Sequence, residues 1–84
     1  MSDKTSLIGP QCVAARGLVG WSRSALAEAS GVSMATLADF EAGKRQPYDR
    51  TLRDIQSALE SAGVVFLPNG ESKDGGPGVR LRRE

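Results

Sequence analysis

The sequence of 84 residues contains no histidine and a single cysteine, Cys12. One cysteine cannot form an internal disulfide bond, and a chain without histidine lacks a common zinc ligand. Cys12 falls on a predicted core face and the carboxylates are scattered, so no pair of side chains suits acid–base or nucleophilic catalysis. We therefore expect no metal ion, no cofactor and no enzyme activity.

Long apolar runs are missing as well, and so is a large excess of charge of either sign. No stretch approaches the roughly 20 apolar residues that a membrane helix requires, and the first residues lack the basic and apolar segments of a secretory signal. Both absences predict a cytoplasmic protein without a membrane partner. The formal net charge of +1 is small for a protein that binds nucleic acid.

Glycines, prolines and serines divide the sequence into four predicted helices. The first begins with Gly9 as its cap and Pro10 at its first helical position, and it ends near Val19. The fourth begins at about Asp49 and stops at Gly63. The predicted core consists of apolar residues at helical spacing in residues 22–41 and in the fourth helix. These residues are Leu26, Val32, Leu37, Phe40, Leu52, Ile55 and Leu59.

Residues 22–41 have the outline of a helix-turn-helix. Ser22 and Ser33 can cap two short helices, and Gly31 between them is free to adopt a positive φ. Here the chain resembles the Cro and lambda-repressor-like helix-turn-helix family, also called XRE, over residues 11–62. The residues that carry the resemblance are Ala15-Arg16, Gly20-Trp21-Ser22, the helix-turn-helix segment itself, Gly43, Thr51-Leu52 and Ala58-Leu59-Glu60.

The resemblance implies a mainly α fold, with a four-helix Cro/repressor-like domain over residues 9–63 after an N-terminal tail of residues 1–8. Residues 64–84 form a C-terminal extension. Within it, residues 64–67 and 79–82 favour β-structure, and the polar, glycine-rich residues 71–78 predict a flexible loop.

The two tail segments are predicted to pair within the chain and to present an exposed strand edge to a second subunit. A single small core is marginal at this length, which also favours a homodimer. The alternating pattern places Val65 and Leu81 on inward faces of the two strands. As an alternative, residues 70–84 stay disordered. The predicted dimerisation residues are Val64, Val65, Phe66, Leu67, Val79 and Leu81.

The resemblance implies that the third helix lies in the major groove of DNA and that its base-reading positions fall on Met34, Ala35, Thr36 and Asp39. None of these is Arg, Lys, Gln or Asn, the residue types that make bidentate contacts to bases. Met34 and Ala35 can touch thymine methyls, and Thr36 can meet a methyl or a phosphate. Asp39 can accept a hydrogen bond from a cytosine amine, although nearby phosphates repel it.

Positive side chains occur where the family places its phosphate contacts. Arg23 opens the second helix, and Lys44 and Arg45 follow the third. Together with Ser22 and Ser33 at the two helix starts, these are the predicted phosphate-binding residues. The alternative is an ordinary solvated surface.

Two further positions match the family in a structural role. Arg16 and Glu41 correspond to a pair that forms an ion pair in related proteins and braces the first helix against the third. A semi-buried pair of this kind sets orientation more than net stability.

Two functions follow from these features. The first is a sequence-specific, DNA-binding transcriptional regulator, a repressor or control protein, that binds a pseudo-palindromic double-stranded operator as a dimer. The alternative is a protein-binding regulator, antiactivator or antitoxin-like, that keeps the fold and grips another regulatory protein through Met34, Ala35, Ala38 or the tail strand. The small net charge and the weak base-reading set favour the second.

Overall fold

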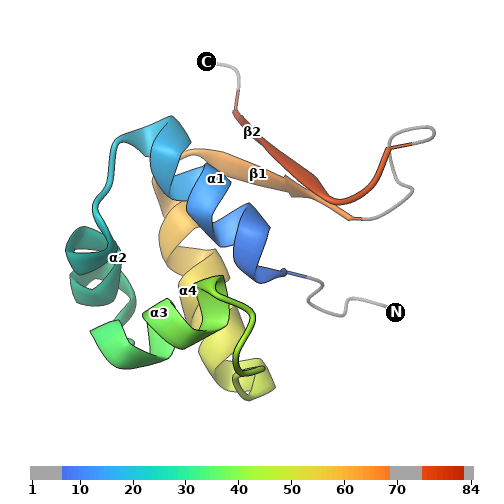
Figure 1. The fold of residues 1–84 in the computed structure, drawn as a ribbon. Helices are drawn as coiled ribbons and strands as arrows, with labels where there is room; N and C mark the ends of the chain where they lie inside the picture. The colour runs from blue at the N-terminus through green and yellow to red at the C-terminus, as the bar shows by residue number, and fades with distance from the viewer. Residues whose placement is uncertain (1–6, 69–74, 83–84) are drawn as a thin grey trace.

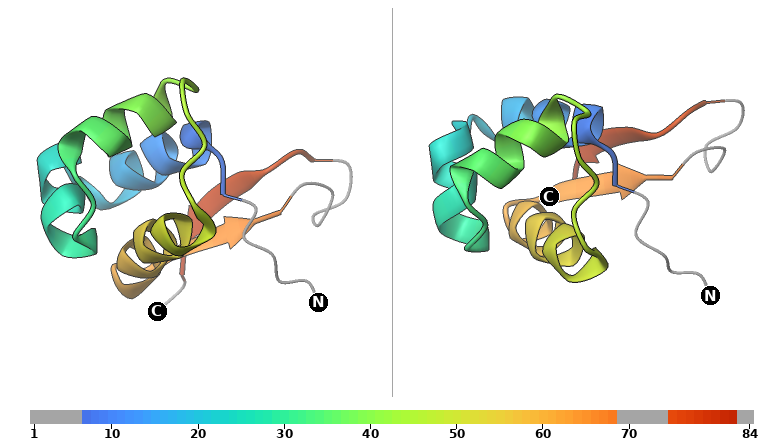
Figure 2. Two further views of the ribbon diagram at one scale, coloured as in Figure 1. Left: turned by 90° about the horizontal axis from the view of Figure 1, so that it is seen from below. Right: turned by 60° about the horizontal axis from the view of Figure 1, so that its bottom comes forward.

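The computed structural model describes residues 7–68 and 75–82. Over these residues the chain is mainly helical, as predicted, with four helices and a two-stranded antiparallel sheet. The strands lie beside the first helix, while the second and third helices project on the other side (Figure 1; Figure 2). The elements are α1 (Gly9–Val19), α2 (Arg23–Ser30), α3 (Met34–Glu41), α4 (Asp49–Ser61), β1 (Val64–Leu67) and β2 (Gly78–Leu81).

The helix-turn-helix forms as its capping residues dictate. The Ser22 hydroxyl accepts a hydrogen bond from the Ala25 amide at 3.0 Å, and the Ser33 hydroxyl accepts one from the Thr36 amide at 3.1 Å. Between the two helices, Gly31 adopts a φ of 76°, the left-handed conformation that glycine tolerates without strain. These caps fix where α2 ends and where α3 begins.

The start of α1 differs from the prediction, because Ile8 and not Gly9 occupies the N-cap position. The Gln11 side chain accepts a hydrogen bond from the Ile8 amide at 2.9 Å. Gly9 instead lies against the end of α3, where an added Cβ would clash with the Phe40 carbonyl oxygen and sit 3.1 Å from Glu41 Cα. The glycine therefore allows the start of α1 to approach the end of α3 closely.

A single cluster of apolar side chains fills the space between the helices and the hairpin. The predicted core residues are all buried in it, and Cys12 is completely buried. Trp21 is partly buried and packs against the same cluster, so it belongs to the core and not to a site. The cluster comprises Leu7, Cys12, Ala15, Leu26, Val32, Leu37, Phe40, Leu52, Ile55, Leu59 and Val64.

Strand β1 pairs with β2 so that Val64 faces Leu81 and Val65 faces Arg80. Residues opposite each other in an antiparallel pair share a face and neighbours alternate, so Val65 and Leu81 lie on opposite faces of the hairpin. The prediction that both point inward is therefore wrong for Val65. Strand β2 also begins one residue earlier than predicted, at Gly78. Of the predicted flexible loop, residues 71–74 lie outside the described residues.

The hairpin is attached to α1 by one buried amide. Gln11, only 4% exposed, donates from Nε2 to the Leu67 carbonyl at 3.3 Å and to the Gly78 carbonyl at 3.0 Å. Val79 packs against the apolar core as well. The C-terminal strands thus form part of the folded domain.

Candidate nucleic-acid interface

The outward face of α3 is the surface to which the family resemblance assigns base reading. Ala35 and Asp39, one helical turn apart, lie at the middle of this face and opposite the buried Leu37 and Phe40. Met34, at the first position of the helix, is 47% exposed. Asp39 is the one charged side chain among the four predicted base-reading residues.

Thr36, the remaining base-reading candidate, is half-buried at the start of α3. Its hydroxyl oxygen accepts a hydrogen bond from the Ser33 hydroxyl at 3.0 Å, and the same serine caps the helix. Ser22 caps α2 in the same way. Both serines thus hold the helix starts in place and remain exposed.

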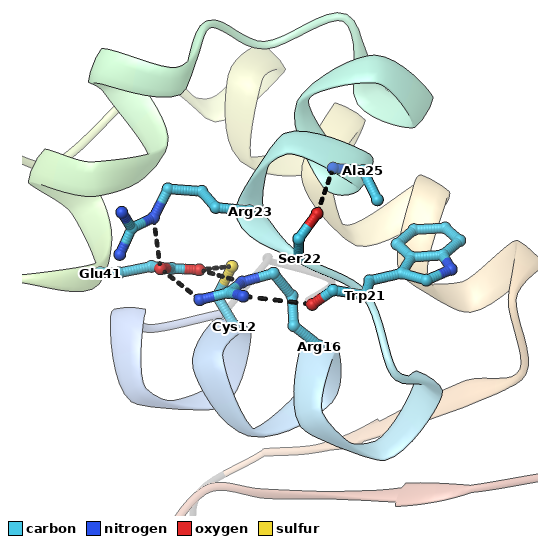
Figure 3. Close-up of polar contacts among 7 residues, drawn as sticks. All are labelled: Cys12, Arg16, Trp21, Ser22, Arg23, Ala25 and Glu41. Carbon is cyan, nitrogen blue, oxygen red and sulfur yellow. Dashed lines mark hydrogen bonds and ion pairs between the residues drawn. The ribbon is translucent and has the colours of Figure 1, made fainter.

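Behind this face, three helices meet at the carboxylate of Glu41, whose side chain is only 3% exposed (Figure 3). The ion pair expected with Arg16 is present, with Nη2 2.9 Å from Oε1 and Nε 2.9 Å from Oε2. Two contacts at this carboxylate could not be foreseen from the sequence. Arg23 donates from Nε to Oε1 at 3.1 Å, and the Cys12 thiol donates to Oε2 at 3.0 Å.

These contacts set the charge states in the cluster. Burial raises the pKa of the Glu41 carboxyl, but the hydrogen bonds from Arg16, Cys12 and Arg23 outweigh it, so the pKa lies below its ordinary value of 4.5. Burial and the hydrogen bond to Glu41 raise the pKa of the Cys12 thiol. The cluster thus holds a carboxylate and a neutral thiol, and Cys12 lacks the thiolate character of a nucleophile.

Arg23 takes part in both this cluster and the exposed surface. Its side chain is 41% exposed, and only Nε bonds to Glu41. Within residues 7–68 and 75–82, its two Nη groups have no hydrogen-bond partner. Glu41 thus orients the guanidinium at the start of α2 and leaves its outer side open to an anion.

The connector after α3 carries the other predicted cations. Lys44 is exposed, and Arg45, whose side chain is 52% exposed, lies with Nη1 3.8 Å from Oδ2 of Asp39. Arg45 also lines a hollow of about 340 Å³ between α3 and the start of α4. The sequence did not predict this hollow, because it forms only where α3 packs beside the start of α4. The hollow is lined by Thr36, Arg45, Gln46, Pro47, Tyr48 and Thr51.

The predicted dimerisation residues divide into two groups. Val64 is 1% exposed, and Phe66 and Val79 pack against the chain's own core, so these three side chains face into the fold. Val65 and Leu67 lie on the opposite face of the hairpin, and Leu81 is 49% exposed at its end.

Other kinds of site are not found in the part of the chain that the structure describes. No three His, Cys, Asp or Glu side chains gather there as a metal site would need. None of the described helices has the length and apolar character needed to cross a bilayer.

Comparison with known proteins agrees with the architecture. A family model described as Helix-turn-helix, of the Cro/C1 type, matches residues 14–62, which is more than half of the chain. Among curated proteins no relative matches. The family comprises DNA-binding regulators, and its match covers α2, α3 and α4 completely. The chain belongs to the Cro/C1-type helix-turn-helix family, also known as the XRE family.

Proposed function

We propose that the protein is a sequence-specific transcriptional regulator, most simply a repressor or control protein, that inserts α3 into the major groove. The observation that carries this proposal is the uncovered face of α3 with cations on both sides of it. Arg23 is the first residue of α2, the helix that precedes α3, and Lys44 and Arg45 follow the end of α3. A regulator of this kind acts in the cytoplasm.

Base reading falls to the outward face of α3. Met34 and Ala35 contact thymine methyl groups, and Thr36 contacts a methyl or a phosphate. Asp39 accepts a hydrogen bond from the exocyclic amine of a cytosine. Such a set gives fewer hydrogen bonds to bases than Arg or Gln would, so phosphate contacts supply a large share of the affinity.

Phosphates are bound by the cations and by the two serine-capped helix starts. Arg23 offers its Nη groups while Glu41 holds Nε at 3.1 Å, which reduces the rotamer freedom that binding has to remove. Lys44 is exposed and contributes a mobile charge. Ser22 offers its exposed hydroxyl hydrogen to a phosphate oxygen at the start of α2. Ser33 does so at the start of α3 by exchanging the hydrogen bond that it donates to Thr36.

A homodimer is proposed through the free edge of β2. The Arg82 amide bonds to the Gly63 carbonyl at 2.7 Å, and hydrogen-bonded pairs alternate along an antiparallel ladder. The backbone groups of Val79 and Leu81 therefore face away from β1. A two-fold axis at Val79 would pair the Val79 amide and carbonyl with those of a second copy and would let the Leu81 amide donate to the Pro77 carbonyl of that copy. It also sets Arg80 opposite Gly78 of that copy. This register avoids two facing arginines.

Selection from random-sequence duplexes tests the DNA-binding proposal. A dimeric regulator should recover a pseudo-palindrome with half-sites about 10–10.5 base pairs apart or a multiple of that spacing. Recovered sequences without any common motif would contradict it.

Sedimentation velocity of Leu81→Pro tests the dimer. Proline removes an edge amide but no ladder hydrogen bond to β1, so the variant should fold as a monomer. Leu81→Ala keeps the amide and should remain dimeric. A dimeric proline variant would exclude pairing through this edge.

A second candidate function, binding to another regulatory protein, is favoured by the exposed side of α1. That side is an uncharged stripe at helical spacing, with Val13 45% and Leu18 42% exposed. Gly17 within it has no atom near the position of an added Cβ, so packing inside the chain does not require a glycine there. The stripe consists of Pro10, Val13, Ala14, Gly17 and Leu18.

Gly17→Lys separates the two functions, because it places a charge on the stripe without a clash inside the fold. A regulator that acts through α3 should keep its operator affinity in this variant. A protein that acts through the α1 stripe should keep its fold and lose regulation in a reporter assay while any DNA binding stays the same.

A further inference from the structure

Two of the three cations assigned to phosphates lie within ion-pair distance of carboxylates of α3. Arg23 Nε lies 3.1 Å from Glu41 and Arg45 Nη1 lies 3.8 Å from Asp39. The two pairs differ in access to solvent, since the Glu41 side chain is 3% exposed whereas those of Asp39 and Arg45 are 42% and 52% exposed. The pair of Glu41 is therefore a fixed part of the fold, and the pair of Asp39 is open to exchange.

Binding to DNA changes the surroundings of the exposed pair. A phosphate that draws the Arg45 guanidinium away from α3 separates it from Asp39. Asp39 lies on the outward face of α3, so its carboxylate then faces the groove and the neighbouring phosphates without a counter-charge. Among the groups that bases present in the major groove, the cytosine amine is the usual hydrogen-bond donor to a carboxylate.

We propose that Asp39 determines sequence specificity by forming an ion pair with Arg45. Arg45 can leave this pair without a cost in free energy only where a cytosine amine takes its place beside Asp39. This inference rests on the proposed function and deepens it. On random DNA, the gain from the new phosphate contact is offset by the unpaired carboxylate. On the operator, Arg45 binds its phosphate and Asp39 binds cytosine, and both charges have partners. The penalty on random sequences widens the affinity ratio between operator and random DNA.

Fluorescence anisotropy with a random duplex and with the selected operator tests this proposal at several salt concentrations. Asp39→Ala should bind the random duplex roughly three- to tenfold more tightly, because an anion near the phosphates is removed and Arg45 is freed. The slope of log affinity against log salt should steepen by about 0.9 per subunit. The affinity ratio between operator and random duplex should fall. Asp39→Asn provides a second neutral variant if the alanine variant folds poorly.

Glu60→Ala is the matched control, because it removes an exposed acidic side chain near the end of α4, at the hairpin end of the molecule (Figure 1). It should change neither the random-duplex affinity nor the slope. Arg45→Ala supplies the coupling test: with Arg45 absent, Asp39→Ala should no longer steepen the slope.

The outcomes separate this inference from the proposed function. A wild-type protein that selects an operator, with Asp39→Ala no different from Glu60→Ala, overturns the inference alone. So does an equal effect of Asp39→Ala with and without Arg45, because Asp39 would then act by direct repulsion. A wild-type protein that binds no duplex even at 50 mM salt overturns both.

Discussion

Replacing Glu41 with glutamine should unfold the domain at a much lower temperature, although the two side chains have nearly the same shape. The carboxylate accepts hydrogen bonds from Arg16, Arg23 and Cys12. In the glutamine variant an NH2 group replaces one of the two acceptor oxygens, and it then faces the N–H or S–H groups that donated to that oxygen. The Arg16 guanidinium also loses its counter-charge. Since no cavity is created, the loss measures the charge cluster and not packing.

The expected cost follows from burial. Removing one partner of a buried ion pair costs about 3–5 kcal/mol, and the 15% exposure of the Arg16 side chain favours the lower end. A domain of this size has a total stability of roughly 4–13 kcal/mol. A loss of about 3 kcal/mol therefore removes a large part of it and lowers Tm by roughly 12–24 °C.

Thermal unfolding followed by circular dichroism measures this loss. Arg23→Gln is the matched control, because that side chain is 41% exposed and should cost less than about 1 kcal/mol. The double variant Arg16→Met with Glu41→Leu removes both charges and should recover most of the lost stability. A Glu41→Gln variant within about 0.5 kcal/mol of the parent would refute the role assigned to the cluster.

Further predictions concern two glycines and pH. Gly9→Ala should destabilise the fold by about 1–3 kcal/mol, because its Cβ meets the Phe40 carbonyl. Gly17→Ala should stabilise it by about 0.5–1 kcal/mol, since its Cβ meets no other atom. Equal changes in the free energy of unfolding for the two variants, measured in urea, would contradict this contrast. The pKa of Glu41 is lowered, so its contribution is complete above its ordinary value of 4.5 and is lost as pH falls through the folded value. Acid titrations of unfolding free energy should thus show a weaker pH dependence in Glu41→Gln.

Local signals in the sequence were sufficient to predict the four helices. Ser22 and Ser33 cap their helices, and Gly31 and Gly43 both adopt the left-handed conformation. Each of these features depends on hydrogen bonds or backbone angles within a few residues. Gly9 differs because its role depends on α3, which is distant in the sequence, and a capping pattern alone cannot indicate it.

Long-range partners limited the prediction of the site and the hairpin. The family resemblance supplied the Arg16–Glu41 pair, but nothing in the spacing shows that Arg23 reaches the same carboxylate 18 residues away. Likewise, the attachment of both strands to Gln11 joins residues 56 and 67 positions apart. Alternation along each strand was visible in the sequence, whereas the register that places Val65 on the outer face depends on pairing.

The salt dependence of operator binding, measured for the wild-type protein and for Lys44→Ala, tests the DNA-binding account most directly. The wild type should lose affinity steeply between 50 and 200 mM salt, with a log–log slope of about −0.9 for each phosphate neutralised. Lys44→Ala should make the slope shallower by about one unit per subunit, and the Arg82→Ala control on the hairpin should leave it unchanged. A flat salt dependence, or equal slopes for the wild type and Lys44→Ala, would contradict the placement of DNA along α3.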